Sequence, residues 1–141
     1  MMYLLDANVL IAAVVKEHHH HATAVRWVRD HPGELALCPI VEGALARFLV
    51  GQGKRGRAAT AALANAYEDM GFALWPDLVS YQAVDLSHVT GRGQVTDAYL
   101  VALARSRDAE LVSFDKGLRQ AFPDTVVDPE EAETGRNLEA S

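Results

Sequence analysis

Four carboxylates stand beside apolar runs rather than among other polar residues. Asp6 interrupts the opening stretch "MMYLLDANVLIAAVV", and the other three occur in "IVEGALARFLV" (Glu42), "VTDAYLVALA" (Asp97) and "LVSFDKGL" (Asp115). An ionised carboxylate in an apolar interior is costly unless it is paired, hydrogen-bonded or bound to a cation. The sequence must therefore supply a group that compensates the charge of Asp6 in particular.

A divalent cation is the compensation that would suit all four acids together. Carboxylates held close together repel one another, and their pKa values rise when no cation is present. Mg²⁺ and Mn²⁺ prefer oxygen ligands and keep several waters, and a metal-bound water is more acidic, which suits hydrolysis of a phosphodiester. We predict a site of this kind with Asp6 and Asp97 as principal ligands, completed by Asp115 and Glu42 directly or through water.

Three of these acids also have an ordinary structural explanation. Asp97 and Asp115 could be charges at helix N-termini, where they interact favourably with the helix dipole. Glu42 could be an exposed residue in the first turn of its helix. Asp6 is the hardest to explain in this way, because it directly follows an apolar strand that would be central in the sheet.

The acids converge only if the fold brings their segments together. Short apolar runs predict strands at residues 1–5, 34–39, 72–76, 109–114 and 124–128. Amphipathic segments predict helices at residues 8–15, 21–31, 40–50, 57–70, 79–89, 96–107 and 115–122. Asn8 and Thr96 are the expected N-caps of two of them. This alternation predicts an α/β fold, a mostly parallel sheet of four to five strands flanked by helices on both faces, with its crevice at the carboxyl ends of the strands.

The composition fits one globular domain. Of the 141 residues, 50% are hydrophobic and 23% are charged, which is ordinary for a soluble protein. We predict a domain at residues 1–128 and a flexible acidic tail at residues 129–141. The single cysteine, Cys38, excludes an internal disulfide and a thiolate metal site. The early apolar run at residues 9–15 is short and has no basic segment before it, so we expect no signal peptide, no membrane span and a cytoplasmic location.

The net charge of −6 is concentrated near the C-terminus. From Asp124 onward there are six acids and one base, which leaves 13 acids and 12 bases in the rest of the chain. If four of those acids held a metal, the remaining surface would be mildly basic. Charge therefore permits a nucleic-acid partner without favouring one.

The motifs "LLDANVLIAA", "VEGALARFL", "VTDAYLVALA" and "LVSFDKGL", in this order and spacing, resemble the four acidic motifs of PIN-domain ribonucleases. The match is closest to the VapC toxins of bacterial toxin–antitoxin pairs, and it runs from residue 1 to about residue 127. It implies a single PIN-like domain that acts as a Mg²⁺- or Mn²⁺-dependent endoribonuclease through Asp6, Glu42, Asp97 and Asp115. The resemblance also implies supporting polar residues, which are Asn8, Thr96 and Ser113.

The resemblance implies partners as well. These are an RNA substrate, a VapB-like antitoxin whose basic side chain reaches the acidic pocket, and a second copy of the chain in a homodimer or a higher toxin–antitoxin assembly. Because carboxylates repel phosphates, basic residues must surround the pocket, and the candidates are Arg47, Arg92 and Lys116. Arg47 matches a basic residue that is frequent on this helix in the family.

Other functions fit the sequence less well. A phosphoacceptor receiver domain needs two adjacent acids after its first strand and an aspartate after its third, whereas Asp6 is alone and Asp77 follows a proline. A catalytically silent PIN-like RNA-binding module conflicts with the four intact acids. The histidines at residues 18–21 and the "GQGKRGR" at residues 51–57 are interpreted as turns, and Cys38, Trp27 and Trp75 as packing residues.

Overall fold

The chain folds around a parallel sheet, and the computed structural model describes residues 1–131 of it. The strands are β1 (Tyr3–Leu5), β2 (Leu35–Leu37), β3 (Ala73–Leu74), β4 (Glu110–Val112) and β5 (Val126–Val127). They lie in the order β3-β2-β1-β4-β5, and every pairing is parallel. The prediction that β1 is central is confirmed, and Asp6 directly follows it.

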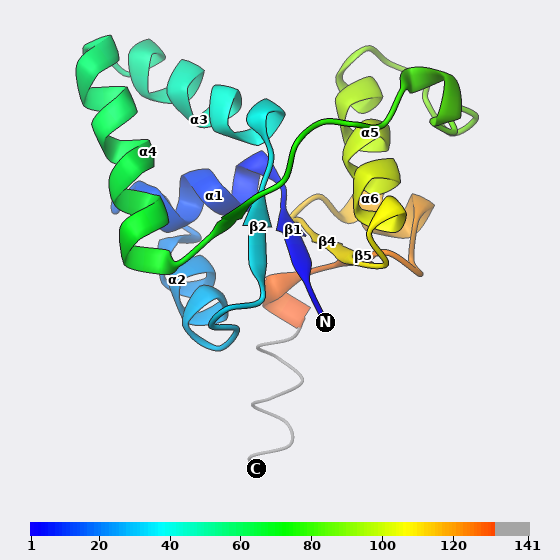
Figure 1. Ribbon diagram of the computed structural model, residues 1–141, viewed down its shortest axis with the longest axis horizontal. Coiled ribbons are helices and arrows are strands. Elements are labelled where there is room, and N and C mark those ends of the chain that lie inside the picture. The colour runs from blue at the N-terminus through cyan, green and yellow to red at the C-terminus, as the bar shows by residue number, and fades with distance from the viewer. Residues whose placement is uncertain (132–141) are drawn as a thin grey trace.

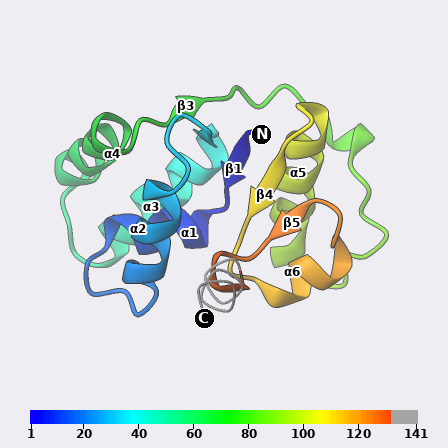
Figure 2. The ribbon, with the colours of Figure 1, turned by 90° about the horizontal axis from the view of Figure 1, so that it is seen from below.

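Helices cover both faces of this sheet, as the sequence predicts. They are α1 (Ala7–Val14), α2 (His21–Arg29), α3 (Pro39–Gly51), α4 (Gly56–Met70), α5 (Gly93–Ser106) and α6 (Lys116–Ala121). Figure 1 shows α1 to α4 gathered on one side of the central strands and α5 with α6 on the other, and Figure 2 shows the same division from below. Helices on both faces explain why the central strands read as unbroken apolar runs. Leu4, Leu5, Leu37 and Leu111 are all fully buried.

The prediction of a helix at residues 79–89 is wrong. This segment forms only a single 3₁₀ turn, η1 (Tyr81–Ala83). Its apolar side chains do not pack as a helical face, since Leu86 is 41% exposed and Leu78, just before the segment, is 81% exposed. Side chains hold the backbone locally instead: Ser80 Oγ accepts a hydrogen bond from the Gln82 amide and Asp85 Oδ1 accepts one from the Ser87 amide. Such local bonds compete with helix formation.

Both predicted N-caps are also wrong. Asp6, rather than Asn8, caps α1, because its carboxylate accepts a hydrogen bond from the Ala7 amide. The helix α5 begins at Gly93, three residues before Thr96. The turn in front of α5 is closed by Gln94, whose Oε1 accepts hydrogen bonds from the Thr90 amide at 2.6 Å, the Thr90 hydroxyl at 3.2 Å and the Gly91 amide at 3.3 Å.

The first residues of the predicted tail lie against the domain. His20 Nδ1 is 3.0 Å from Glu130 Oε1, and Arg119 forms an ion pair with Glu131. Residues 132–141 lie outside the described residues, so flexibility of the tail stays a prediction. Within residues 1–131, no helix combines the length and the apolar character that crossing a bilayer requires.

Candidate active site

Asp6 occupies the junction between the central strand and α1. Its backbone amide extends the β1–β4 ladder by donating to the Val112 carbonyl at 2.9 Å. Its Oδ1 accepts from the Ala7 amide at 2.7 Å, and its Oδ2 accepts from the Ser113 hydroxyl at 2.8 Å. The residue is 6% exposed. Both carboxylate oxygens therefore have donors, which is the hydrogen-bonding compensation that its burial requires.

Ser113 joins Asp6 to two other predicted site residues. Its buried hydroxyl accepts hydrogen bonds from Asn8 Nδ2 and from the Asp115 amide, each at 3.1 Å, while it donates to Asp6. Asn8 Oδ1 in turn accepts from the Phe114 amide at 3.2 Å. This network ties the segment after β1 to the segment after β4, and it fits the supporting role predicted for Asn8 and Ser113. Thr96 is exposed and takes no part in it.

Asp115 caps the short helix α6. Its Oδ1 accepts a hydrogen bond from the Leu118 amide at 3.0 Å, and its side chain is otherwise exposed. A Cβ atom at position 117 would lie 3.3 Å from this oxygen. Gly117 therefore keeps the space beside the Asp115 carboxylate open.

Asp97 lies in the second turn of α5, because the helix begins earlier than the sequence predicts. No acidic residue occupies the first turn of α5. The ordinary explanation of Asp97 as an N-terminal helix charge therefore loses its basis, since the dipole effect fades beyond the first turn. Partial burial, together with the charges of Asp6 and Asp115, raises the pKa of Asp97 to about 6.

The same repulsion acts on Asp6. Burial is the main cause that raises its pKa, and the charge of Asp115 adds to it, while the hydrogen bonds from Ser113 and Ala7 lower it. Asp6, Asp97 and Asp115, from three elements far apart in sequence, are thus close enough to influence each other's ionisation. We call these three residues the acidic trio.

Glu42 is held separately. It lies in the first turn of α3, and its Oε2 accepts a hydrogen bond from the Tyr67 hydroxyl of α4 at 2.7 Å. Burial and the neighbouring Glu42 carboxylate raise the pKa of Tyr67 well above its usual range, so the phenol stays a donor. The structure therefore fixes Glu42 through α4, whereas the acidic trio is fixed through β1, β4 and α5.

The acidic trio supplies the carboxylate oxygen ligands that a hard divalent cation prefers. Among residues 1–131, no three Asp, Glu, His or Cys side chains converge tightly enough to enclose a metal ion unaided. Mg²⁺ does not need such a cage, because it is usually held through one or two carboxylates and keeps several waters. A cation would also relieve the repulsion that raises the pKa values of Asp6 and Asp97.

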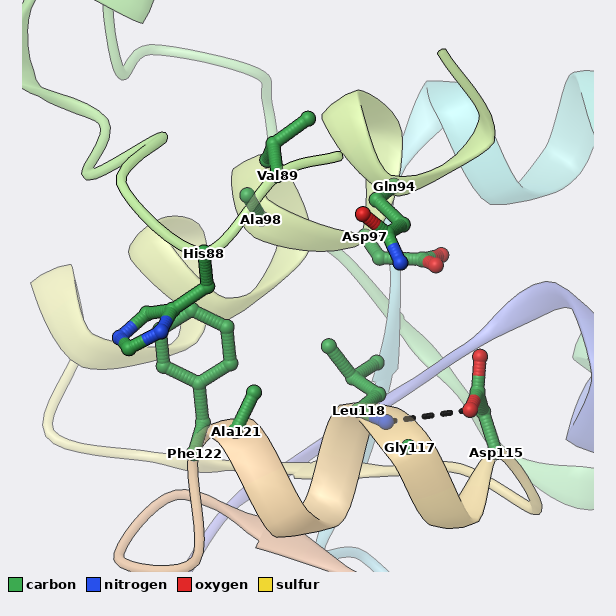
Figure 3. Close-up of a pocket in the computed structure, with 10 residues that line it drawn as sticks. All are labelled: His88, Val89, Gln94, Asp97, Ala98, Asp115, Gly117, Leu118, Ala121 and Phe122. Atoms are coloured by element: carbon green, nitrogen blue, oxygen red, sulfur yellow. Dashed lines mark hydrogen bonds between the residues drawn. The ribbon is translucent and has the colours of Figure 1, made fainter. Parts of the chain in front are cut away.

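Two members of the trio open onto a pocket of about 170 Å³ between α5 and α6. Figure 3 shows the carboxyl groups of Asp97 and Asp115 at one end of this pocket, with His88 and Phe122 at the other. The remaining lining residues are mostly apolar: Val89, Gln94, Ala98, Gly117, Leu118 and Ala121. The pocket thus joins a charged end to an apolar one.

The three predicted RNA-binding residues are exposed but do not line this pocket. Arg92 directly precedes α5 and Lys116 is the first residue of α6, so both begin the helices that form its walls. Arg47 Nη1 lies 3.4 Å from the position of a Cβ atom at residue 43. The guanidinium of Arg47 therefore folds back along α3, toward the turn that holds Glu42.

Comparison with known proteins identifies the family. The family model of the PIN domain matches residues 3–122 of the chain. The chain belongs to the PIN-domain family. Ribonuclease VapC29 from Mycobacterium tuberculosis is 43% identical to this PIN domain over 127 residues, which cover 90% of this chain and 96% of the relative.

Solved structures share the fold of this PIN domain. VapC20 from Mycobacterium tuberculosis, described as a sarcin-ricin loop cleaving toxin, superposes with a TM-score of 0.67 at 18% identity, covering 85% of this chain and 95% of that one. A toxin–antitoxin complex from Klebsiella pneumoniae gives 0.63 at 18% identity, covering 90% and 97% of the two chains. The predicted PIN-like α/β fold is therefore confirmed.

Two polar residues of the site region, Tyr67 and Gln94, were not predicted from the sequence. Tyr67 lies one helix away from Glu42, and only the packing of α3 against α4 brings the two together. Gln94 directly follows the glycine-rich "GRG" at residues 91–93, a turn signal that could have pointed to a residue closing the turn. The packing roles predicted for Cys38, Trp27 and Trp75 are confirmed, because all three side chains are buried.

Proposed function

We propose that this PIN domain is a metal-dependent endoribonuclease that hydrolyses phosphodiester bonds of RNA. The observation that carries the proposal is the acidic trio, of which Asp97 and Asp115 lie at one end of a pocket, in a chain 43% identical to a ribonuclease. Its cofactor is Mg²⁺ or Mn²⁺, because all the donors are hard carboxylate oxygens. The identity between the two chains covers almost their full length, so the relative's activity is a fitting hypothesis for this chain.

The residues of the site would divide the work between them. Asp6 and Asp97 would hold the cation, and Asp115 and Glu42 would complete the site directly or through water. When bound, the cation acidifies a water and stabilises charge on the attacking and leaving oxygens. Ser113 orients Asp6, and Tyr67 orients Glu42, through the hydrogen bonds described above.

RNA needs positive charge around these acids. Arg92 and Lys116 begin the two helices of the pocket, and Arg47 lies along α3 near Glu42. We propose that these three residues contact phosphates and thereby offset the repulsion from the acidic trio. Contacts of this kind position the substrate without reading its sequence.

We further infer that the protein is the toxin of a toxin–antitoxin pair in the cytoplasm, bound by a VapB-like antitoxin. A guanidinium from the antitoxin could pair with the acidic trio in a bidentate manner and exclude both metal and substrate. Exposed positions of the alanine-rich helix α4 offer a surface for an antitoxin helix or a homodimer contact. Trp27 cannot contribute to this surface, because it is only 5% exposed and packs against Tyr3 and His31.

Cleavage of total RNA tests the nuclease proposal. Wild-type protein with Mg²⁺ or Mn²⁺ should cleave RNA, chelation should stop cleavage, and Asp6→Asn should abolish it while keeping a side chain that can cap α1. Asp69→Asn, at an exposed position of α4, is the matched control and should cleave normally. Full cleavage by Asp6→Asn, or cleavage that ignores chelation, would contradict the proposal.

Growth measurements test the toxin role separately. Expression in a bacterial host should slow growth when the chain is produced alone, and co-expression of the neighbouring reading frame should restore growth. Equal growth in both cases, from a folded product, would count against the toxin role and would leave the nuclease chemistry to the cleavage assay.

A further inference from the structure

The pocket between α5 and α6 continues away from the acids as a narrow apolar slot. Val89 and Ala98 form one side of it, and Leu118 and Ala121 of α6 form the other (Figure 3). Its volume of about 170 Å³ is well below the roughly 300–1,000 Å³ of pockets that enclose drug-sized ligands. The slot therefore suits one planar ring rather than an extended ligand.

The far end of the slot is aromatic. The rings of His88 and Phe122 pack edge to face, with centroids 5.3 Å apart and an interplanar angle of 82°. Phe122 is buried, and the guanidinium carbon of Arg105 lies 5.2 Å from its ring centroid. The ring of His88 is exposed and lines the pocket. Aromatic side chains beside a nuclease site are surfaces on which nucleobases stack.

Gln94 presents a hydrogen-bond donor to the slot, and its orientation is fixed. Two backbone amides, of Thr90 and Gly91, donate to its side chain. Because a backbone amide can only donate, the atom facing the loop must be the carbonyl oxygen. The amide nitrogen then lies on the other side, and Figure 3 shows it directed toward α6. Within residues 1–131, no group accepts a hydrogen bond from this nitrogen.

We propose that the slot binds one unpaired nucleobase of the RNA, next to the scissile phosphate, and that Gln94 selects a base with a carbonyl oxygen rather than an amino group at C4 of a pyrimidine or C6 of a purine. This inference rests on the proposed function. A nucleobase is apolar on its faces and polar on its edge, which matches two apolar sides and a single donor. The exocyclic oxygen at C4 of uracil or at C6 of guanine accepts from Gln94 Nε2, whereas the amino group that cytosine and adenine carry at the same position would oppose one donor to another.

The variant Gln94→Glu tests the selection directly. Glutamate keeps an oxygen for the Thr90 and Gly91 amides, so the loop stays closed, but it replaces the donor facing the slot with an acceptor. Gln82→Glu makes the same charge change at an exposed position of η1 outside the slot, and it is the matched control. The substrate is a pool of single-stranded RNA of random sequence, and the measurement is the base composition at each position relative to the cuts.

Wild type and Gln82→Glu should favour uracil or guanine at one fixed position beside the cut. Gln94→Glu should shift that position away from uracil and toward cytosine or adenine by about tenfold, because a carboxylate accepts from their amino groups at C4 or C6 and repels the C4 oxygen of uracil. A lower rate at every site with unchanged base composition would overturn the inference, since it would show only the added charge. His88→Ala should weaken binding of short RNA by about tenfold through lost stacking, and unchanged binding would also overturn it.

A binding experiment separates this inference from the proposed function. Uridine and cytidine 5′-monophosphates are titrated into the wild-type protein without metal, and the Gln94 side-chain amide is followed by NMR. Tighter binding of the uridine nucleotide, with a shift of the Gln94 signal, supports the slot even if no RNA is cleaved, in which case only the proposed function fails. Equal binding of both nucleotides, or no shift at Gln94, overturns the slot even if RNA is cleaved.

Discussion

Among single residues, Asp97 is the one whose ionisation most clearly lowers the stability of the folded protein. Its pKa of about 6 lies above the usual aspartate value of 3.8, chiefly because of burial and then because of Asp6 and Asp115. Between about pH 4 and pH 6, the metal-free folded protein therefore binds a proton that the unfolded chain has released. Stability contributed by this group falls as the pH rises through that window, and the full cost persists above it.

We expect Asp97→Asn to stabilise the metal-free protein at pH 7. Because Asp97 is only half-buried, solvent screening reduces the gain to on the order of 1 kcal/mol, or a few degrees in Tm. The gain should shrink as the pH falls toward 4, and thermal unfolding across pH 4–7 measures it. Asp69→Asn serves as the control. With Mg²⁺ present, wild type should gain stability that the variant lacks. An unchanged or lower Tm for metal-free Asp97→Asn at pH 7 would contradict this account.

At the level of single residues, the sequence identified the acids but not what holds them. Asp6 and Asp115 could be found because each directly follows an apolar strand. The role of Ser113 followed only from a resemblance, because its bond to Asp6 spans 107 positions in the chain. Tyr67 and Gln94 were missed because a long-range contact and a loop closure leave no periodic pattern in a sequence.

Among the elements, the strands and helices were predictable from their apolar runs, and the segment at residues 79–89 was the exception. The five strands and six of the seven predicted helices are present, and all of them except β3 bury at least one apolar side chain. Both residues of β3 are exposed, but the flanking Phe72 and Trp75 are buried. The segment at residues 79–89 packs only Val79 and Val84 partly against the core, while Leu86 is 41% exposed, so it lacks a continuous helical face and its local hydrogen bonds prevail. That failure matters for the site, since this extended segment places His88 and Val89 on the pocket.

Packing of α3 against α4 lets the Tyr67 hydroxyl bind Glu42, one acid of the proposed site. The variant Tyr67→Phe removes this hydrogen bond alone. Loss of the phenol hydroxyl should free the Glu42 carboxylate and cost about 1 kcal/mol of stability, less than a fully buried hydrogen bond to a charge. RNA cleavage should fall by less than about tenfold, because Glu42 would act at the edge of the site. Urea unfolding and cleavage rates measure the two effects. Tyr81→Phe, at an exposed position, is the control, and equal behaviour of the two variants would show that the bond is unimportant.

The whole molecule combines an acidic net charge with a proposed polyanionic substrate. The charge is −6, with much of the excess near the C-terminus, where Glu130 and Glu131 pair with His20 and Arg119. Nucleic-acid binding therefore has to rely on local rather than overall charge. Arg92 and Lys116 lie where α5 and α6 begin, at the walls of the pocket, and Arg47 lies along α3, with its guanidinium beside Gly43.

RNA binding should weaken steeply as salt rises, because each phosphate contact releases counterions. For single-stranded RNA, the slope of log K against log salt is about −0.7 for each phosphate neutralised. Arg47→Ala, Arg92→Ala and Lys116→Ala should each reduce the slope by about that amount, whereas Arg57→Ala, at an exposed position of α4 outside the pocket, should leave it unchanged. Fluorescence anisotropy measures the slopes, with a short labelled RNA and Asp6→Asn protein, which is expected to bind RNA without cleaving it. A slope near zero for the parent protein, or equal slopes in all four variants, would show that these three residues do not hold the substrate.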